Sequence, residues 1–212
     1  MLNDYKDKQS LVYNLFMNDI NNNCVTHAYL IDENNYEDAY SMVIAFVKRL
    51  LCAKEHSEDD YNTCALCKQI ESLNYSEFKV IEPDGVNIKK SQILDLQKEF
   101  SKSCVLGNRK IYIIRDCEKM RTEAANSMLK FLEEPEDGII AILTTNNINN
   151  VLSTIISRCK VVKLINTSNE EVFVDEVLEN LAIDFVSGIE TRGIDMILDV
   201  KDMWFSKITS KD

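Results

Sequence analysis

The sequence predicts an α/β fold in which five parallel strands form one sheet that is flanked by helices. Short apolar runs such as IIAILTT (139–145) have the length of buried strands, and they alternate with longer segments whose apolar residues recur every three or four positions. This alternation is typical of a parallel sheet covered on both faces, because a crossover between parallel strands needs a helix-length connection.

The first half of the domain shows this order clearly. Leu11, Leu15 and Phe16 share one helical face, and the run THAYLID that follows is typical of a buried strand. Seven apolar residues at intervals of three and four then predict an amphipathic helix, and Pro83 ends the next strand, FKVIEP. The expected elements are a helix over 7–20, a strand over 26–32, a helix of about 14 residues within 34–52 and a strand over 78–83, with a cysteine-bearing insertion at about 52–70.

The same alternation continues and completes a first domain over residues 1–165. SQILDLQKEFS has helical periodicity, KIYIIRD reads as a strand, and Pro135 stops the long helix that precedes IIAILTT. The expected elements are a helix over 91–101, a strand over 110–116, a helix over 118–134, a strand over 139–145, a short helix over 151–156 and a strand over 159–164.

Residues 166–212 are expected to form a second, all-helical domain. A capping box, formed by Thr167 or Ser168 with the glutamate three positions later, precedes the amphipathic run VFVDEVLENLAIDF, and a further helical stretch covers 194–208. Two helices are few to close a core. The domain is therefore expected to be incomplete, and to lean on the first domain or continue beyond this sequence.

Composition narrows the classes of function. With 24 Lys and Arg against 35 Asp and Glu, the net charge of -11 argues against tight autonomous binding to DNA, which needs a basic surface. Neither a signal peptide nor an apolar run of about 18 residues is present, so a cytoplasmic location is expected. In that setting the odd number of cysteines, seven, predicts reduced thiols or metal ligands.

Glycine is scarce, with five residues in 212 and none before Gly85. A phosphate-binding loop needs glycine for positive φ angles and close approach of the backbone, so no conventional nucleotide loop can open this chain. Gly188 and Gly193 have the spacing of such a loop, but Ile194 and Asp195 follow where Lys and Ser/Thr are required, so we take the match as chance.

The segment EKMRTEAANSMLKFLEEPEDG, followed by IIAILTT and STIISRC, resembles the clamp-loader branch of the AAA+ ATPases. The similarity covers about 27–164, and AANSMLKFLEEP and SRC are its most specific parts. This resemblance implies a RecA-like AAA+ domain over residues 1–165, a partial helical lid over 166–212, and membership of the bacterial DNA polymerase III holoenzyme.

The resemblance also implies that the nucleotide site is degenerate. Asp32 to Tyr40 lies where the family has its phosphate loop, with Ala39 at the lysine position and Tyr40 at the threonine position. Four carboxylates within residues 32–38 would repel a triphosphate. Arg115 and Asp116 stand where active members have adjacent Asp and Glu for magnesium and water. No ATP binding and no intrinsic ATPase activity are expected, and Thr144 or Thr145, at the sensor position, is assigned a structural role.

Ser157-Arg158-Cys159 matches the family motif that supplies an arginine finger to ATP held by an adjacent subunit. A planar, permanently charged guanidinium can neutralise charge that develops on a transferring phosphoryl group. Arg158 is therefore the expected catalytic residue, acting in trans. The alternative is a surface arginine at the end of a loop.

Cys52, Cys64 and Cys67 lie where the family has a four-cysteine zinc module, and the Cys64-x-x-Cys67 spacing suits two thiolates on one tetrahedral zinc. Tyr61 stands at the remaining cysteine position, so His56 is the candidate fourth ligand. The alternative is three reduced, structural cysteines without metal.

The resemblance therefore implies a non-catalytic clamp-loader subunit. Its partners would be the gamma/tau and delta subunits, with the sliding clamp and primed DNA reached through the assembly. The family's helical collar domain is not complete in 212 residues, so the chain is either a fragment or a shortened relative. Two rival hypotheses are an active gamma/tau-like ATPase and a free-standing pseudo-ATPase interaction module.

Overall fold

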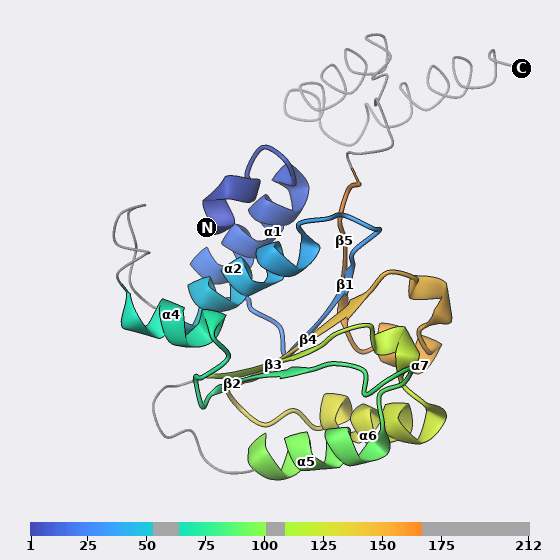
Figure 1. The fold of residues 1–212 in the computed structure, drawn as a ribbon. Helices are drawn as coiled ribbons and strands as arrows, with labels where there is room; N and C mark the ends of the chain where they lie inside the picture. Colours follow the sequence, from blue (N-terminus) through green and yellow to red (C-terminus); the bar gives the residue numbers. More distant parts are fainter. Residues whose placement is uncertain (53–63, 101–108, 167–212) are drawn as a thin grey trace, which may run out of the picture. The chain divides into compact units, whose positions relative to one another are not determined.

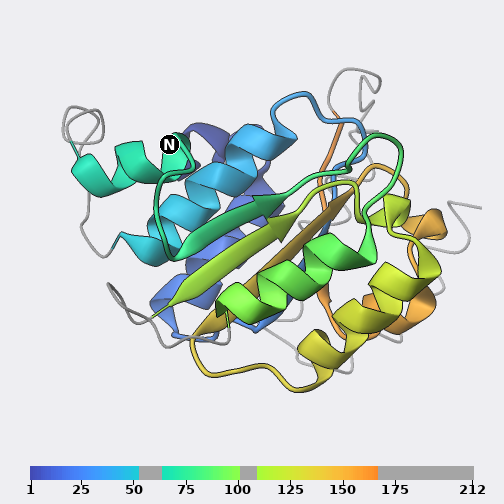
Figure 2. The same cartoon turned by 60° about the horizontal axis from the view of Figure 1, so that its bottom comes forward.

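The computed structural model describes residues 1–52, 64–100 and 109–166, and these form a single parallel sheet with helices on both faces (Figures 1 and 2). The strands run in the order β2-β3-β4-β1-β5, and every neighbouring pair is parallel. Their bounds are β1 Ala28–Asp32, β2 Phe78–Ile81, β3 Lys110–Ile114, β4 Ile139–Thr145 and β5 Lys160–Lys163. The five-stranded α/β fold predicted from the sequence is confirmed.

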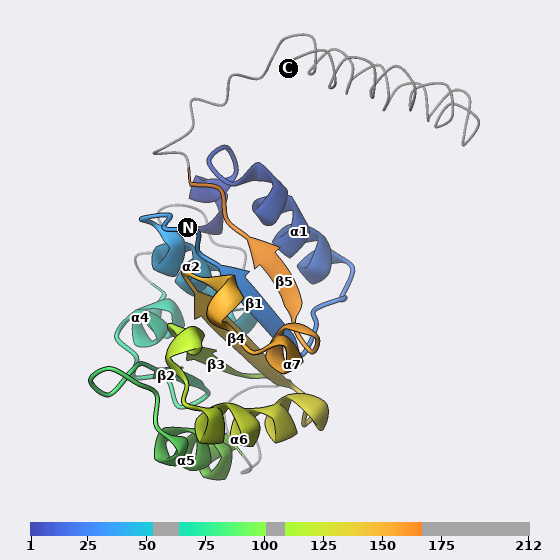
Figure 3. The ribbon, with the colours of Figure 1, turned by 90° about the vertical axis from the view of Figure 1, so that its right-hand side faces the viewer.

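Alternate residues of the central strands point to opposite faces of the sheet, and each face has its own helical cover. Tyr29 and Ile31 of β1 belong to the core cluster that includes α1 and α2, whereas Leu30 belongs to the cluster that includes α5, α6 and α7. These two groups of helices lie on opposite faces of the sheet (Figure 3). The helices are α1 Ser10–Asn21, α2 Ala39–Leu51, α4 Ala65–Glu71, α5 Lys90–Phe100, α6 Thr122–Glu133 and α7 Ser153–Ile156, with short 3₁₀ turns at Leu2–Tyr5, Cys117–Lys119 and Ile148–Asn150. None of the described helices is long and apolar enough to cross a membrane.

The described helices differ from the sequence expectation in some of their boundaries and in one additional helix. Helix α2 has 13 residues, close to the expected length of about 14, and residues 33–38 form the loop after β1. Helix α1 begins at Ser10, three residues later than expected. Helix α6 begins at Thr122, after a 3₁₀ turn and an extended Arg121. Helix α4 was not expected within the cysteine insertion. The helical lid expected over 166–212 lies outside the described residues from 167 onward.

A buried ionic network attaches the first helix to the sheet. The Asp19 carboxylate of α1 accepts a hydrogen bond from the Tyr29 hydroxyl at 2.8 Å and pairs with the Lys160 ammonium at 2.7 Å. Burial, and secondarily the bond to Asp19, raises the pKa of Tyr29, so its hydroxyl remains a donor. Asp19 therefore joins α1 to β1 and β5 through one carboxylate.

Replacing Asp19 with alanine is expected to lower the free energy of unfolding by about 2 kcal/mol, because the buried Tyr29 hydroxyl and the Lys160 ammonium lose their shared acceptor. Urea denaturation followed by circular dichroism measures the change. Asp7→Ala, which removes an exposed carboxylate, is the matched control and should change stability little. Equal losses in the two variants would contradict a special role for Asp19.

A second contact fixes the point at which the chain leaves the sheet. The side-chain amide of the buried Gln9 donates to the carbonyl of Ile165 at 2.6 Å and accepts from the Ile165 N–H at 2.9 Å. Both backbone groups of Ile165 are satisfied by this one side chain. The exit of β5 is thereby held against the segment that precedes α1.

Candidate functional site

The candidate site lies at the carboxyl end of β1, where the loop 33–38 leads into α2 (Figure 1). In open parallel sheets, ligands bind outside the carboxyl ends of the strands, so this loop occupies the expected position for a nucleotide. Asn34 and Asn35 adopt left-handed φ values of 48° and 56°, which asparagine tolerates better than most residues. The loop therefore makes its sharp turns without glycine.

The backbone N–H groups of residues 33–36, in the first part of this loop, are already occupied. A phosphate-binding loop works by presenting such groups to a ligand. Here four consecutive N–H groups donate within the chain: Glu33 to the carbonyl of Thr145 at 2.8 Å, Asn34 to the Asp32 carboxylate at 3.3 Å, Asn35 to the Asn146 side chain at 3.2 Å and Tyr36 to the carbonyl of Glu33 at 2.8 Å. A phosphate would have to displace these acceptors.

Asn146, in the segment after β4, has a central part in this closure. Its side-chain oxygen accepts from Asn35, and its Nδ2 donates to Oε2 of the buried Glu33 at 3.0 Å. The same end of the loop is also held from the β5 side, because the Asn34 side-chain amide donates to the Leu164 carbonyl at 3.3 Å. The loop is thus tied to the segments that follow both neighbours of β1, β4 and β5.

Arg115 fills the end of β3 beside the start of α2. Its guanidinium carbon lies 4.2 Å from the centroid of the Tyr40 ring, and its Nη1 pairs with Oε1 of Glu82 at 2.6 Å. Burial raises the pKa of the Tyr40 hydroxyl although the nearby guanidinium lowers it, so the ring stays neutral. Tyr40, at the position of the phosphate-loop threonine, is therefore in direct contact with Arg115, at the position of the magnesium-binding pair. The positive charge of Arg115 is paired with Glu82.

Asp116 and Thr145 have local partners, whereas the buried Thr144 hydroxyl has none among the described residues. Asp116 pairs with Lys119 at 2.9 Å, and this contact raises the pKa of Lys119. Thr144 and Thr145 are both fully buried at the end of β4. The Thr145 hydroxyl accepts from the N–H of Asn147 at 3.1 Å, and its carbonyl accepts from the loop. Thr145 thus ties the end of β4 to the loop 33–38, and the structural role expected at the sensor position stays a prediction.

Arg158 follows the short helix α7 on the opposite face of the sheet from α2, and one third of its side chain is exposed. Its guanidinium contacts three oxygens: Oε1 of Glu133 at 2.6 Å, the carbonyl of Thr154 at 2.8 Å and the hydroxyl of Ser157 at 3.2 Å. Sequence reasoning missed the Glu133 contact. The LEEP sequence at the end of α6 was its only signal.

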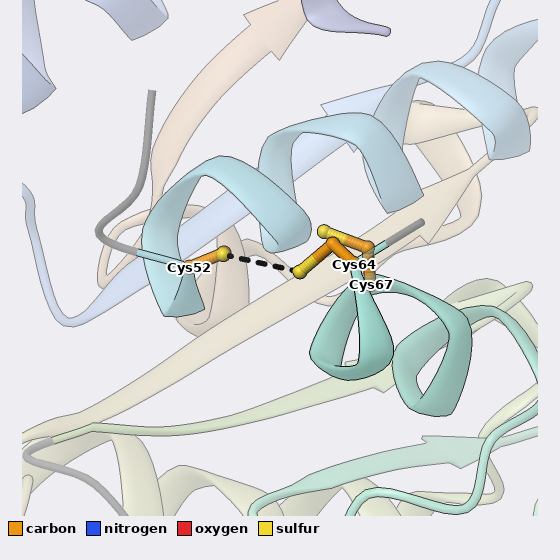
Figure 4. Close-up of side chains that lie close together, drawn as sticks. All are labelled: Cys52, Cys64 and Cys67. Carbon is orange, nitrogen blue, oxygen red and sulfur yellow. Dashed lines mark hydrogen bonds between the residues drawn. The ribbon is translucent and has the colours of Figure 1, made fainter. Parts of the chain in front are cut away.

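The structure brings Cys52, Cys64 and Cys67 together (Figure 4). All three sulfur atoms lie within 4.8 Å of one another, and the Cys52 and Cys64 sulfurs are 3.8 Å apart. Thiolates on one tetrahedral zinc are separated by about 3.8 Å, given Zn–S bonds of about 2.3 Å. The residues present therefore fit three corners of a zinc site, whereas His56 and Tyr61 lie outside the described residues.

The three thiols differ in their surroundings. The Cys67 backbone N–H lowers the pKa of the partly exposed Cys64, whereas burial raises the pKa of Cys67 to about 12. Zinc binds thiolates and displaces their protons, so a metal would reverse the preference of Cys67 for the neutral form. Cys52 ends α2 and Cys64 precedes α4, so the cluster joins two helices.

Comparison with known proteins finds relatives among the subunits of DNA polymerase III. Residues 8–168 match the model of a family described as DNA polymerase III, delta subunit. DNA polymerase III subunit delta' of Bacillus subtilis is 38% identical over 157 residues, which are 74% of this chain and 47% of that protein. The corresponding protein of Pseudomonas aeruginosa is 28% identical over 135 residues, 63% of this chain and 41% of that protein. The chain therefore spans less than half the length of these curated relatives.

A solved structure supports the fold. A DNA polymerase III gamma subunit-related protein from Thermotoga maritima superposes with a TM-score of 0.55 at 22% identity, covering 80% of this chain and 53% of that chain. At this identity the likeness concerns the fold alone. It agrees with the AAA+ architecture expected from the sequence.

Proposed function

Because this chain belongs to the family of the DNA polymerase III delta subunit, we propose that it is a delta-prime-type clamp-loader subunit that binds no ATP. In this role the chain supplies Arg158 to ATP held by a neighbouring gamma/tau subunit. The delta subunit completes its set of protein partners. Hydrolysis at the completed site would be coupled to closure of the sliding clamp on primed DNA.

The observation that carries the first part of this proposal is the closed loop at the carboxyl end of β1. Its N–H groups donate to Thr145, Asp32 and Asn146, and Arg115 stacks on Tyr40 beside it. A triphosphate with magnesium needs free N–H donors and a carboxylate for the metal. The chain offers a guanidinium instead. This arrangement favours a pseudo-ATPase over an active gamma/tau-like ATPase.

The partly exposed guanidinium of Arg158 supports the second part. It follows a short helix, and about a third of its side chain is exposed beside its contacts with Glu133, Thr154 and Ser157, so an anion of another molecule can reach it. Stabilisation of developing phosphoryl charge by such a group needs no nucleotide in the subunit that donates it. An empty site and a functional finger are therefore compatible in one chain.

We further propose that Cys52, Cys64 and Cys67 hold a structural zinc, with His56 as the fourth ligand. The metal would link the end of α2 to the start of α4 and supply folding free energy to the insertion. The close approach of the three sulfur atoms supports this assignment. The rival reading keeps the same three residues as reduced thiols.

Isothermal titration of the purified chain with ATP and magnesium tests the pseudo-ATPase proposal. We expect no measurable binding up to about 1 mM ATP, because occupied N–H donors and four carboxylates oppose a triphosphate. A gamma/tau subunit of the same organism, titrated under identical conditions, is the positive control. Micromolar affinity in this chain would reject the proposal in favour of an active ATPase.

A further inference from the structure

The end of α6 contacts the proposed finger directly. Oε1 of Glu133 lies 2.6 Å from Nη2 of Arg158, a separation typical of a charge-assisted hydrogen bond. On its other side, Nη1 donates to the Thr154 carbonyl and to the Ser157 hydroxyl. Helices α6 and α7 lie side by side, so residues distant in sequence hold one guanidinium (Figure 3).

The core fixes the position of the carboxylate. Met128 and Leu132 of α6 are buried against the sheet, and Glu133 is the last residue of that helix. Its backbone is therefore set by well-packed neighbours although about half of its side chain is exposed. By contrast, Thr154 and Ser157 belong to the same short segment as Arg158. Of the three contacts, the one with Glu133 is therefore the contact that attaches the guanidinium to a helix outside its own segment.

The contacts leave part of the guanidinium available. An arginine has five N–H donors, and the contacts with Glu133, Thr154 and Ser157 use three of them. The remaining donors can meet an oxygen of another molecule. A long side chain held in this way loses little freedom when it meets an anion, which is the advantage of a preorganised catalytic group.

We propose that Glu133 is a positioning residue for Arg158. Its carboxylate orients the guanidinium so that the remaining donors face the phosphate oxygens of ATP in the adjacent subunit. This inference rests on the proposed function, and it assigns to the LEEP sequence a role beyond ending a helix that covers the sheet. It predicts that Glu133 affects the rate of hydrolysis only through Arg158.

A double-mutant cycle in the reconstituted loader tests this role. Glu133→Ala should lower the rate constant of hydrolysis at the completed site about two- to five-fold, as expected for loss of one partly exposed ion pair, without changing the ATP concentration at half-saturation. Glu133→Gln keeps an acceptor oxygen and should retain most of the rate. Glu134→Gln, at the next and exposed residue, is the matched control and should match the wild type.

Measurements in the Arg158→Ala variant distinguish failure of the proposed function from failure of the inference about Glu133. Glu133→Ala should have no further effect there, because no guanidinium remains to be oriented. If Arg158→Ala itself does not slow hydrolysis, the proposed function fails and this inference fails with it. If Arg158→Ala slows hydrolysis but Glu133→Ala leaves it unchanged or faster, only the inference is overturned. An equal loss from Glu133→Ala in both backgrounds would indicate general structural damage and would also overturn it.

Discussion

Replacing Arg158 with alanine is expected to slow ATP hydrolysis at the adjacent subunit by about 10³-fold, the lower end of the effect of arginine fingers in other phosphoryl-transfer systems. The methyl group of alanine cannot neutralise the charge that develops on the transferred phosphoryl group. Single-turnover hydrolysis by a loader reconstituted with gamma/tau and delta subunits measures the change. The ATP bound at this one site should remain intact while the other sites react.

Two comparisons make this result specific. Arg158→Lys keeps the charge but not the planar fork, so it should restore only part of the rate. The thermal stability of Arg158→Ala should change little, because its ion pair with Glu133 is partly exposed. Gel filtration establishes whether each variant still assembles. Unchanged hydrolysis in an assembled loader would reject the finger, whereas failure of the wild-type chain to assemble would favour a free-standing interaction module.

Removal of zinc is expected to unfold the region around α4, with a loss of order 10 kcal/mol in local folding free energy, as for structural zinc in small domains. The purified chain should contain one zinc, and a chelator should abolish hydrogen-exchange protection in α4. Cys67→Ser should have the same effect as the chelator, because its buried side chain would leave a polar hydroxyl in place of a metal-bound thiolate.

Cys24→Ser is the matched control, because Cys24 is exposed and lies before β1. It should leave both the zinc content and the exchange of α4 unchanged. His56→Ala tests the fourth ligand separately and should lower zinc affinity if the histidine coordinates. A metal-free purified chain whose α4 is equally protected with and without chelator would support the reading of three reduced thiols.

The sheet could be predicted from the sequence because its signal is local. The central strands β1, β3 and β4 are short runs buried on both faces, and such a strand needs no partner to be recognised, whereas the edge strands β2 and β5 are shorter and only partly buried. Boundaries were harder where a loop carries helix-compatible residues. The sequence NNYED at 34–38 continues smoothly into α2, and its loop conformation is held in part by bonds to Asn146 and Leu164, more than a hundred residues away.

The sequence predicts which nucleotide-binding residues the candidate site lacks, but not which side chains are in contact there. Missing glycines, and the identities of Tyr40 and Arg115, can be read along the chain. Their stacking cannot, because it depends on the packing of α2 beside β3. The same holds for Glu133 and Arg158, since neither the period of α6 nor the SRC motif specifies which side chains pair across two helices.

The internal bonds of the loop after β1 also have a thermodynamic consequence. A ligand that binds only the native state adds RT ln(1 + [L]/Kd) to its stability, about 2.7 kcal/mol at a hundred times Kd. Subunits that load and release ATP gain and lose this contribution in every cycle. In this chain Thr145, Asp32 and Asn146 already accept from the donors that a nucleotide would engage. In the proposed role, the free energy of unfolding of this chain does not depend on the ATP concentration, whereas the stability of its ATP-binding neighbours rises and falls as they bind and release ATP.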